Sequence, residues 1–195
     1  MVNPAWLMLG LAVVTLSTAV YCAGRLGYAL ARRRPTDRAV DTFHIAMGVA
    51  MAGMLVPSWS AIPNRAGLLL FGAAAAWFAA TLIRGWHRGS ASAAHAGHVL
   101  GGAAMAYMFW SMQSAGPGGT AMPGMAHAGS EQLPAVGVLL ALGLLGYAWW
   151  TALRLAGLSS APAVAVGHHL VTPRLAACCE VAMSVAMAVP LIGLA

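Results

Sequence analysis

The chain has 195 residues, of which 61% are hydrophobic and only 7% are charged. A water-soluble domain of this size needs more polar side chains to cover its surface, so the composition excludes a soluble globule and favours a lipid bilayer. The net charge of +6 requires no nucleic-acid partner. Basic residues orient a membrane protein and attract the anionic lipids of the inner leaflet, which accounts for the charge.

Apolar segments long enough to form membrane-spanning helices occur six times along the chain. Each crossing of the roughly 30 Å hydrocarbon core takes about 20 helical residues. No Lys or Arg precedes the first segment and it is longer than the apolar part of a signal peptide, so we expect it to remain as a helix. The sequence predicts an all-α polytopic membrane protein with one transmembrane domain over residues 1–195. The spans are predicted at about 5–30, 40–56, 66–84, 94–112, 133–154 and 174–194.

The arginines define an orientation for these spans. All ten basic residues are Arg, and threading the six spans alternately places all but Arg65 on one side of the membrane. By the positive-inside rule this side is cytoplasmic, so both termini are predicted outside the cytoplasm, in a multi-pass protein of the inner (plasma) membrane. The cytoplasmic set is Arg25, Arg32, Arg33, Arg34, Arg38, Arg84, Arg88, Arg154 and Arg174.

An internal repeat relates the second, fourth and sixth spans. They read HIAMGVAMAGM from His44, HVLGGAAMAYM from His98 and EVAMSVAMAVP from Glu180. Positions 1, 4, 8 and 11 of this pattern fall within an arc of about 80° on a helix, so they form one stripe, flanked by small residues that permit close helix packing. The repeating unit is a helical hairpin. The hairpins are predicted at about 1–57, 65–112 and 133–195, with an extracytoplasmic loop at 113–132.

The chemistry of this stripe indicates a soft metal. Met thioethers suit Cu(I), and imidazole is a further copper ligand. The outer loop carries more such groups in the run TAMPGMAHAGS. The candidate metal ligands are His44, Met47, Met51, Met54, His98, Met105, Met108, Met112, Glu180, Met183 and Met187 in the spans, and Met122, Met125 and His127 in the loop.

Each of these groups also has a structural interpretation. Met fills gaps in apolar interiors, Glu180 is explained equally well by an ion pair with a nearby Arg, and Cys22 is explained as a small apolar filler. Two other functions use the same features. His44 and His98 are candidate axial ligands of haem b in an electron-transfer protein, and the small-residue faces suit an accessory or assembly subunit of a membrane complex. The chain has no G-x-S-x-G, H-E-x-x-H or phosphate-loop motif, so no enzyme is predicted.

Two resemblances accompany these motifs. The M-x-x-x-M pairs on parallel helices, with a Met-rich outer segment, resemble the arrangement in copper transporters. The stretches FHIAMGVAMAGML at 43–55 and CEVAMSVAMA at 179–188 resemble actinobacterial integral membrane proteins of domain of unknown function 5134. The family resemblance implies no activity. From the repeated stripe and the Met- and His-containing loop we expect a copper-binding membrane protein of copper transport, delivery or homeostasis. Its expected partners are the bilayer and either other membrane subunits or a periplasmic copper chaperone.

Overall fold

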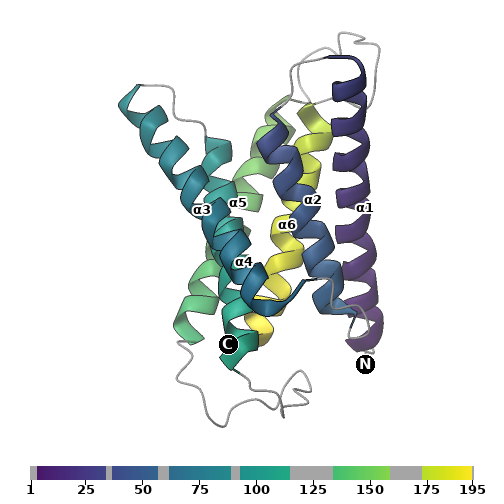
Figure 1. Cartoon of the computed structure of the whole chain (residues 1–195), viewed down its shortest axis with the longest axis vertical. Coiled ribbons are helices and arrows are strands. Elements are labelled where there is room, and N and C mark those ends of the chain that lie inside the picture. The colour runs from purple at the N-terminus through teal and green to yellow at the C-terminus, as the bar shows by residue number, and fades with distance from the viewer. Residues whose placement is uncertain are drawn as a thin grey trace. The chain divides into compact units, whose positions relative to one another are not determined.

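A computed structural model describes residues 4–33, 37–56, 62–88, 93–114, 134–158 and 173–194 of the chain. All regular structure in these residues is helical, which confirms the all-α prediction, and each predicted span coincides with one helix (Figure 1). The helices are α1 (Pro4–Ala31), α2 (Arg38–Leu55), α3 (Asn64–His87), α4 (Ala93–Ser114), α5 (Pro134–Leu158) and α6 (Pro173–Leu194).

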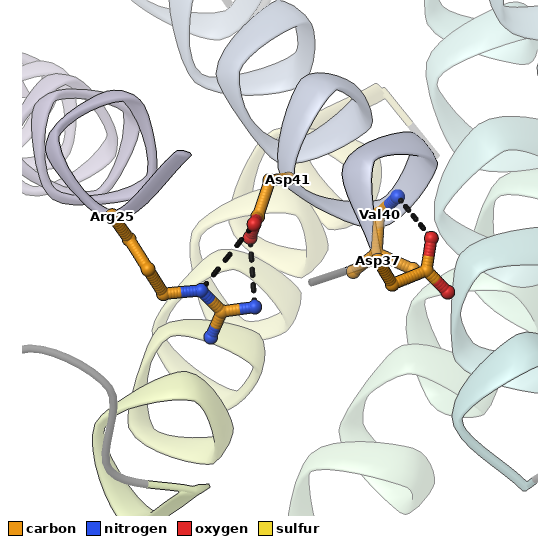
Figure 2. A network of polar contacts seen from close by, with 4 residues as sticks. All are labelled: Arg25, Asp37, Val40 and Asp41. Carbon is orange, nitrogen blue, oxygen red and sulfur yellow. Dashed lines mark hydrogen bonds and ion pairs between the residues drawn. The ribbon is translucent and has the colours of Figure 1, made fainter. Parts of the chain in front are cut away.

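The helix ends follow from local sequence. Proline, whose fixed φ suits the first helical position, begins three of the six helices, namely α1, α5 and α6. The side chain of Asp37 caps α2 by accepting a hydrogen bond from the backbone N–H of Val40 at 3.3 Å (Figure 2). At the other end of α2, Val56 is extended, as expected for a residue that precedes Pro57.

Four helices are long and apolar enough to cross a membrane, so the chain is a membrane protein. The candidate spans are Trp6–Ala31, Asn64–His87, Ala135–Gly157 and Leu175–Gly193. Large apolar side chains lie exposed on these helices, among them Leu69 at 72% and Leu139 at 68%, as contact with lipid requires. Among the described residues, α2 and α4 are not counted with the helices that are long and apolar enough to cross a membrane. They carry histidines, His44 in α2 and His95 and His98 in α4, and α2 also carries Arg38 and Asp41, which lowers their mean hydropathy.

The chain divides into two compact units. The first comprises Met1–Ala61 and Gly146–Ala186, and the second comprises Ile62–Leu145 and Met187–Ala195. The first unit therefore contains α1, α2 and the parts of α5 and α6 that follow Leu145 and precede Met187. The second contains α3, α4 and the remainder of α5 and α6.

In the first unit, α1 packs closely along α2 at Gly48. A Cβ atom added to Gly48 would lie 2.7 Å from the backbone oxygen of Thr15 and 2.8 Å from the Cβ of Ala19. Both distances are too short for non-bonded atoms, and one partner is backbone. The absence of a side chain at Gly48 therefore sets the distance between these helices, as expected for small residues at a helix interface.

Replacing Gly48 with Ala is expected to destabilise the first unit. The added methyl group must push α1 and α2 apart, and overpacking of this kind costs about 1–3 kcal/mol. Thermal unfolding in detergent measures the effect as a lower melting temperature. Gly27→Ala in α1 is the matched control, because nothing lies within 4 Å of a Cβ at that position. Equal melting temperatures for the two variants would contradict the close approach.

In the second unit, α3 packs along α4 through aromatic rings. A Cβ atom on Gly67 would collide with the ring of Phe109, and that ring stacks on Phe71 with centroids 5.8 Å apart. One further contact places the ring of His98 4.9 Å from that of Phe78, centroid to centroid. These contacts fix the side of α4 that α3 covers.

Candidate metal centre

His44 of α2 and Glu180 of α6 come together in the first unit. A ring nitrogen of His44 and a carboxylate oxygen of Glu180 lie within 4.8 Å of each other. His44 is buried and Glu180 is partly buried. An imidazole and a carboxylate at this separation provide a nitrogen and an oxygen donor that one transition-metal ion can share after small side-chain movements.

Glu180 is held by a residue that the sequence did not indicate. The hydroxyl of Tyr147, on α5, donates a hydrogen bond to Oε2 of Glu180 at 2.8 Å. The ring of Tyr147 lies 6.1 Å from that of Trp150, and the guanidinium of Arg154 lies 3.8 Å above the Trp150 ring. Outer partners of this kind orient a metal-binding carboxylate and tune its basicity. Tyr147 is therefore a positioning residue for the candidate centre.

Buried methionines continue from both ligands along the same two helices. Met47 and Met51 follow His44 on α2, and Met183 follows Glu180 on α6; all three are nearly inaccessible. Met47 and Met183 lie three residues, about 4.5 Å along the helix axis, beyond His44 and Glu180, and Met51 lies about 10 Å along the axis beyond His44. Met54, the last residue of this stripe on α2, is partly exposed.

The second unit holds other residues of the predicted set. His98, Met105, Met108 and Met187 are buried. Met112 does not share this burial, because 44% of its surface is exposed, although the sequence paired it with Met108. The loop residues Met122, Met125 and His127 lie outside the described residues.

An ion pair lies near the start of α2. Arg25 of α1 approaches Asp41 of α2 with two nitrogens of one guanidinium edge, Nη2 to Oδ1 at 2.8 Å and Nε to Oδ2 at 3.4 Å (Figure 2). The side chain of Asp41 is only 1% exposed. The sequence offered an Arg partner for Glu180. In the first unit Arg25 contacts Asp41, while Glu180 accepts its hydrogen bond from Tyr147.

The sequence carries only weak signals for Tyr147 and Asp41, which were not predicted as functional residues. Tyr147 stands two residues before a Trp pair, so it fits an aromatic belt, although a Tyr within an apolar span usually needs a partner for its hydroxyl. Asp41 lies at the end of its predicted span, where an acid at a helix N-terminus is unremarkable.

One family model matches most of the chain. The family model described as domain of unknown function (DUF5134) matches residues 36–194. The chain belongs to the DUF5134 family. The DUF5134 match includes His44, Tyr147 and Glu180 and begins after α1. No curated protein and no solved structure matches this DUF5134 protein.

Proposed function

We propose that this chain is a multi-pass inner-membrane protein that binds copper and acts in copper transport, delivery or homeostasis. The observation that carries the proposal is the His44–Glu180 pair, with buried methionines one turn further along each helix. The pair supplies nitrogen and oxygen, and Met47 and Met183 supply thioether sulfur. His98, Met105, Met108 and Met187 are proposed as further ligands only because of their register in the repeat.

Copper is favoured over other metals by this mixture of donors. Imidazole suits Zn, Cu, Fe and Ni alike, and a carboxylate alone favours harder ions. Thioether sulfur narrows the choice, because it is a soft ligand that selects Cu(I). A protein that accepts copper through soft and borderline donors needs no catalytic group, and we propose no enzymatic activity.

The proposed topology has six spans in three hairpins, with both termini outside the cytoplasm. The 18 residues of α2 extend about 27 Å, close to the thickness of the hydrocarbon core. Its polar residues Asp41 and His44 are buried, so they do not oppose insertion in lipid. The end of α1 and the start of α2, which carry Arg25 and Arg38, lie at the same end of the first unit (Figure 1). A cytoplasmic position of this end agrees with the positive-inside rule.

Copper binding is tested with the purified protein in detergent. Cu(I) is titrated against a competing chelator under reducing conditions. Replacing Met47 and Met183 together with Leu is expected to weaken Cu(I) binding at least about tenfold, which is 1.4 kcal/mol, because the soft donors are lost while volume is nearly kept. Met112→Leu is the matched control, since Met112 is exposed. If the variant without Met47 and Met183 binds Cu(I) as tightly as Met112→Leu does, the two thioethers are not ligands.

The same preparation distinguishes two other functions. A Soret band from a haem-replete host would favour a haem b electron-transfer protein with His44 as an axial ligand. A colourless protein that binds no copper and co-purifies with other membrane subunits would favour an accessory or assembly role.

A further inference from the structure

Three arginines with exposed side chains lie where α1 ends and α2 begins. Arg32 and Arg33 directly follow the last residue of the candidate span in α1, and Arg38 is the first residue of α2. These two helix ends lie at the same end of the first unit (Figure 1). We call these three residues the basic corner. Because it directly follows a candidate span, the basic corner belongs at the level of the lipid head groups.

No carboxylate neutralises the basic corner. Within the described ranges of the chain, no ion pair joins its three arginines to an acidic side chain. The two acids near it have other partners, as Figure 2 shows: Asp37 accepts a hydrogen bond from the backbone N–H of Val40, and Asp41 pairs with Arg25. The three arginines also outnumber Asp37, the exposed acid beside them. The basic corner is therefore positively charged and attracts anions.

The backbone of Arg33 is strained in a way that helix stability does not explain. Its φ is 49°, in the left-handed region. Its N–H donates a hydrogen bond to the carbonyl oxygen of Leu30 at 3.2 Å, which closes the last turn of α1. Glycine is the usual residue at such a position, because a side chain there costs about 1–2 kcal/mol. Strain of this kind is typical of functional positions, so the charged side chain of Arg33 is the feature to explain.

The surface of α1 below the basic corner suits a lipid molecule. The guanidinium carbon of Arg32 lies 6.0 Å from the centre of the Tyr28 ring, and tyrosine is typical of the membrane interface. Leu30 is 48% exposed, and nothing lies within 4 Å of a Cβ atom added to Gly27. This part of α1 is therefore apolar and open. Positive groups above an open apolar surface match the phosphate and the hydrocarbon chains of a phospholipid.

We propose that the basic corner binds the head-group phosphate of an anionic phospholipid, with the acyl chains along the open surface of α1. Guanidinium groups bind phosphate through paired N–H donors, which a point charge does not offer. A zwitterionic lipid carries the same phosphate but also a positive group, so the basic corner selects lipids with a net negative charge. The site shares no residue with the candidate copper centre and does not depend on copper binding.

The test is binding of dioleoylphosphatidylglycerol to the full chain in detergent, measured by native mass spectrometry at increasing lipid concentration. Each basic residue near anionic lipid contributes roughly fivefold in affinity. Replacing all three arginines of the basic corner with Gln is therefore expected to weaken binding about 100-fold. Dioleoylphosphatidylcholine has the same chains and no net charge, and it is expected to bind weakly to the wild type and to the variant.

The second unit provides a control with the same loss of charge. Arg65, Arg84 and Arg88 are exposed arginines of that unit, and the control variant replaces all three with Gln. It is expected to bind phosphatidylglycerol as tightly as the wild type does. An equal loss of binding in the control variant would overturn the site, because the attraction would then follow the total charge of the protein.

Arg33→Gly separates the charge of Arg33 from its backbone. Glycine adopts a positive φ without strain, so this variant is expected to keep or raise the melting temperature while its lipid affinity falls roughly fivefold. A purely structural role of Arg33 predicts instead that lipid affinity does not change. That result would overturn the assignment of Arg33 as a lipid contact.

Two further outcomes would overturn the lipid site as a whole. One is equal affinity for phosphatidylglycerol in the wild type and in the variant without the basic corner. The other is displacement of the lipid by inorganic phosphate, since the site would then take a free anion without acyl chains. The copper titrations use different residues, so failure of the lipid site leaves the proposed function standing and failure of copper binding leaves the lipid site standing.

Discussion

Combining His44→Ala with Glu180→Gln is expected to weaken copper binding at the candidate centre by about 100-fold or more. The loss of a single outer partner of a metal ligand typically costs 10- to 100-fold in affinity, and this change removes two direct donors. Glu180→Gln keeps the size of the side chain but removes its charge. The measurement is competition with a chelator in a variant whose three cysteines, Cys22, Cys178 and Cys179, are replaced by Ser, so that no free thiol competes for copper.

Tyr147→Phe is expected to have a smaller effect in the same experiment, about tenfold. The variant removes only the hydroxyl that donates to Glu180, and the ring can still pack. Two controls match the double variant. His87→Ala removes an exposed histidine at the end of α3, and Asp37→Asn changes an exposed acid that caps α2 without losing the cap. Wild-type affinity in the double variant, or equal losses in the controls, would contradict the centre.

Asp41→Ala is expected to cause the largest loss of stability of any variant considered. Removing one partner of a buried ion pair leaves an unpaired charge and typically costs about 3–5 kcal/mol. Asp41 is 1% exposed and contacts two nitrogens of the Arg25 guanidinium, so water cannot readily replace it. Thermal unfolding in detergent should show a marked decrease of the melting temperature. Arg32, which follows the last residue of α1 and is exposed, provides the control. The variant Arg32→Met should have the melting temperature of the wild type.

A double-mutant cycle then isolates the ion pair itself. Arg25→Met combined with Asp41→Leu removes both charges, and apolar replacement of a buried pair is often neutral or stabilising. The double variant is therefore expected to be more stable than the single variant Asp41→Leu, and Arg25→Met alone completes the cycle. If the two single changes add without coupling, Arg25 and Asp41 do not stabilise each other and the contact in Figure 2 has no energetic role.

The helices were predictable because the length of an apolar segment is a local property of the sequence. The expected spans at 5–30 and 174–194 correspond to α1, Pro4–Ala31, and α6, Pro173–Leu194. The burial of Met51 and Met183 followed from helical periodicity, since a stripe at this spacing shares one face. Met112 departs from its expected pairing because it lies one turn beyond Met108 at the end of α4, where its side chain is exposed.

Partnerships between helices were not predictable in the same way. Nothing in the local sequence connects Arg25 with Asp41 or Tyr147 with Glu180, because each contact depends on how two helices pack. His44 and Glu180 were connected only because the repeat gave them the same register. Repeats therefore carry non-local information that single residues do not, and Tyr147 lies outside the repeat pattern.

X-ray absorption at the copper edge tests the central claim most directly. The sample is a cysteine-free variant, with Cys22, Cys178 and Cys179 replaced by Ser, loaded with one equivalent of Cu(I). We expect nitrogen or oxygen and thioether sulfur in the first shell, with the nitrogen and oxygen contribution lost after His44→Ala and Glu180→Gln. The account is contradicted if the cysteine-free protein with His44 and Glu180 intact does not retain copper. It is also contradicted if the two substitutions leave the atoms around copper unchanged.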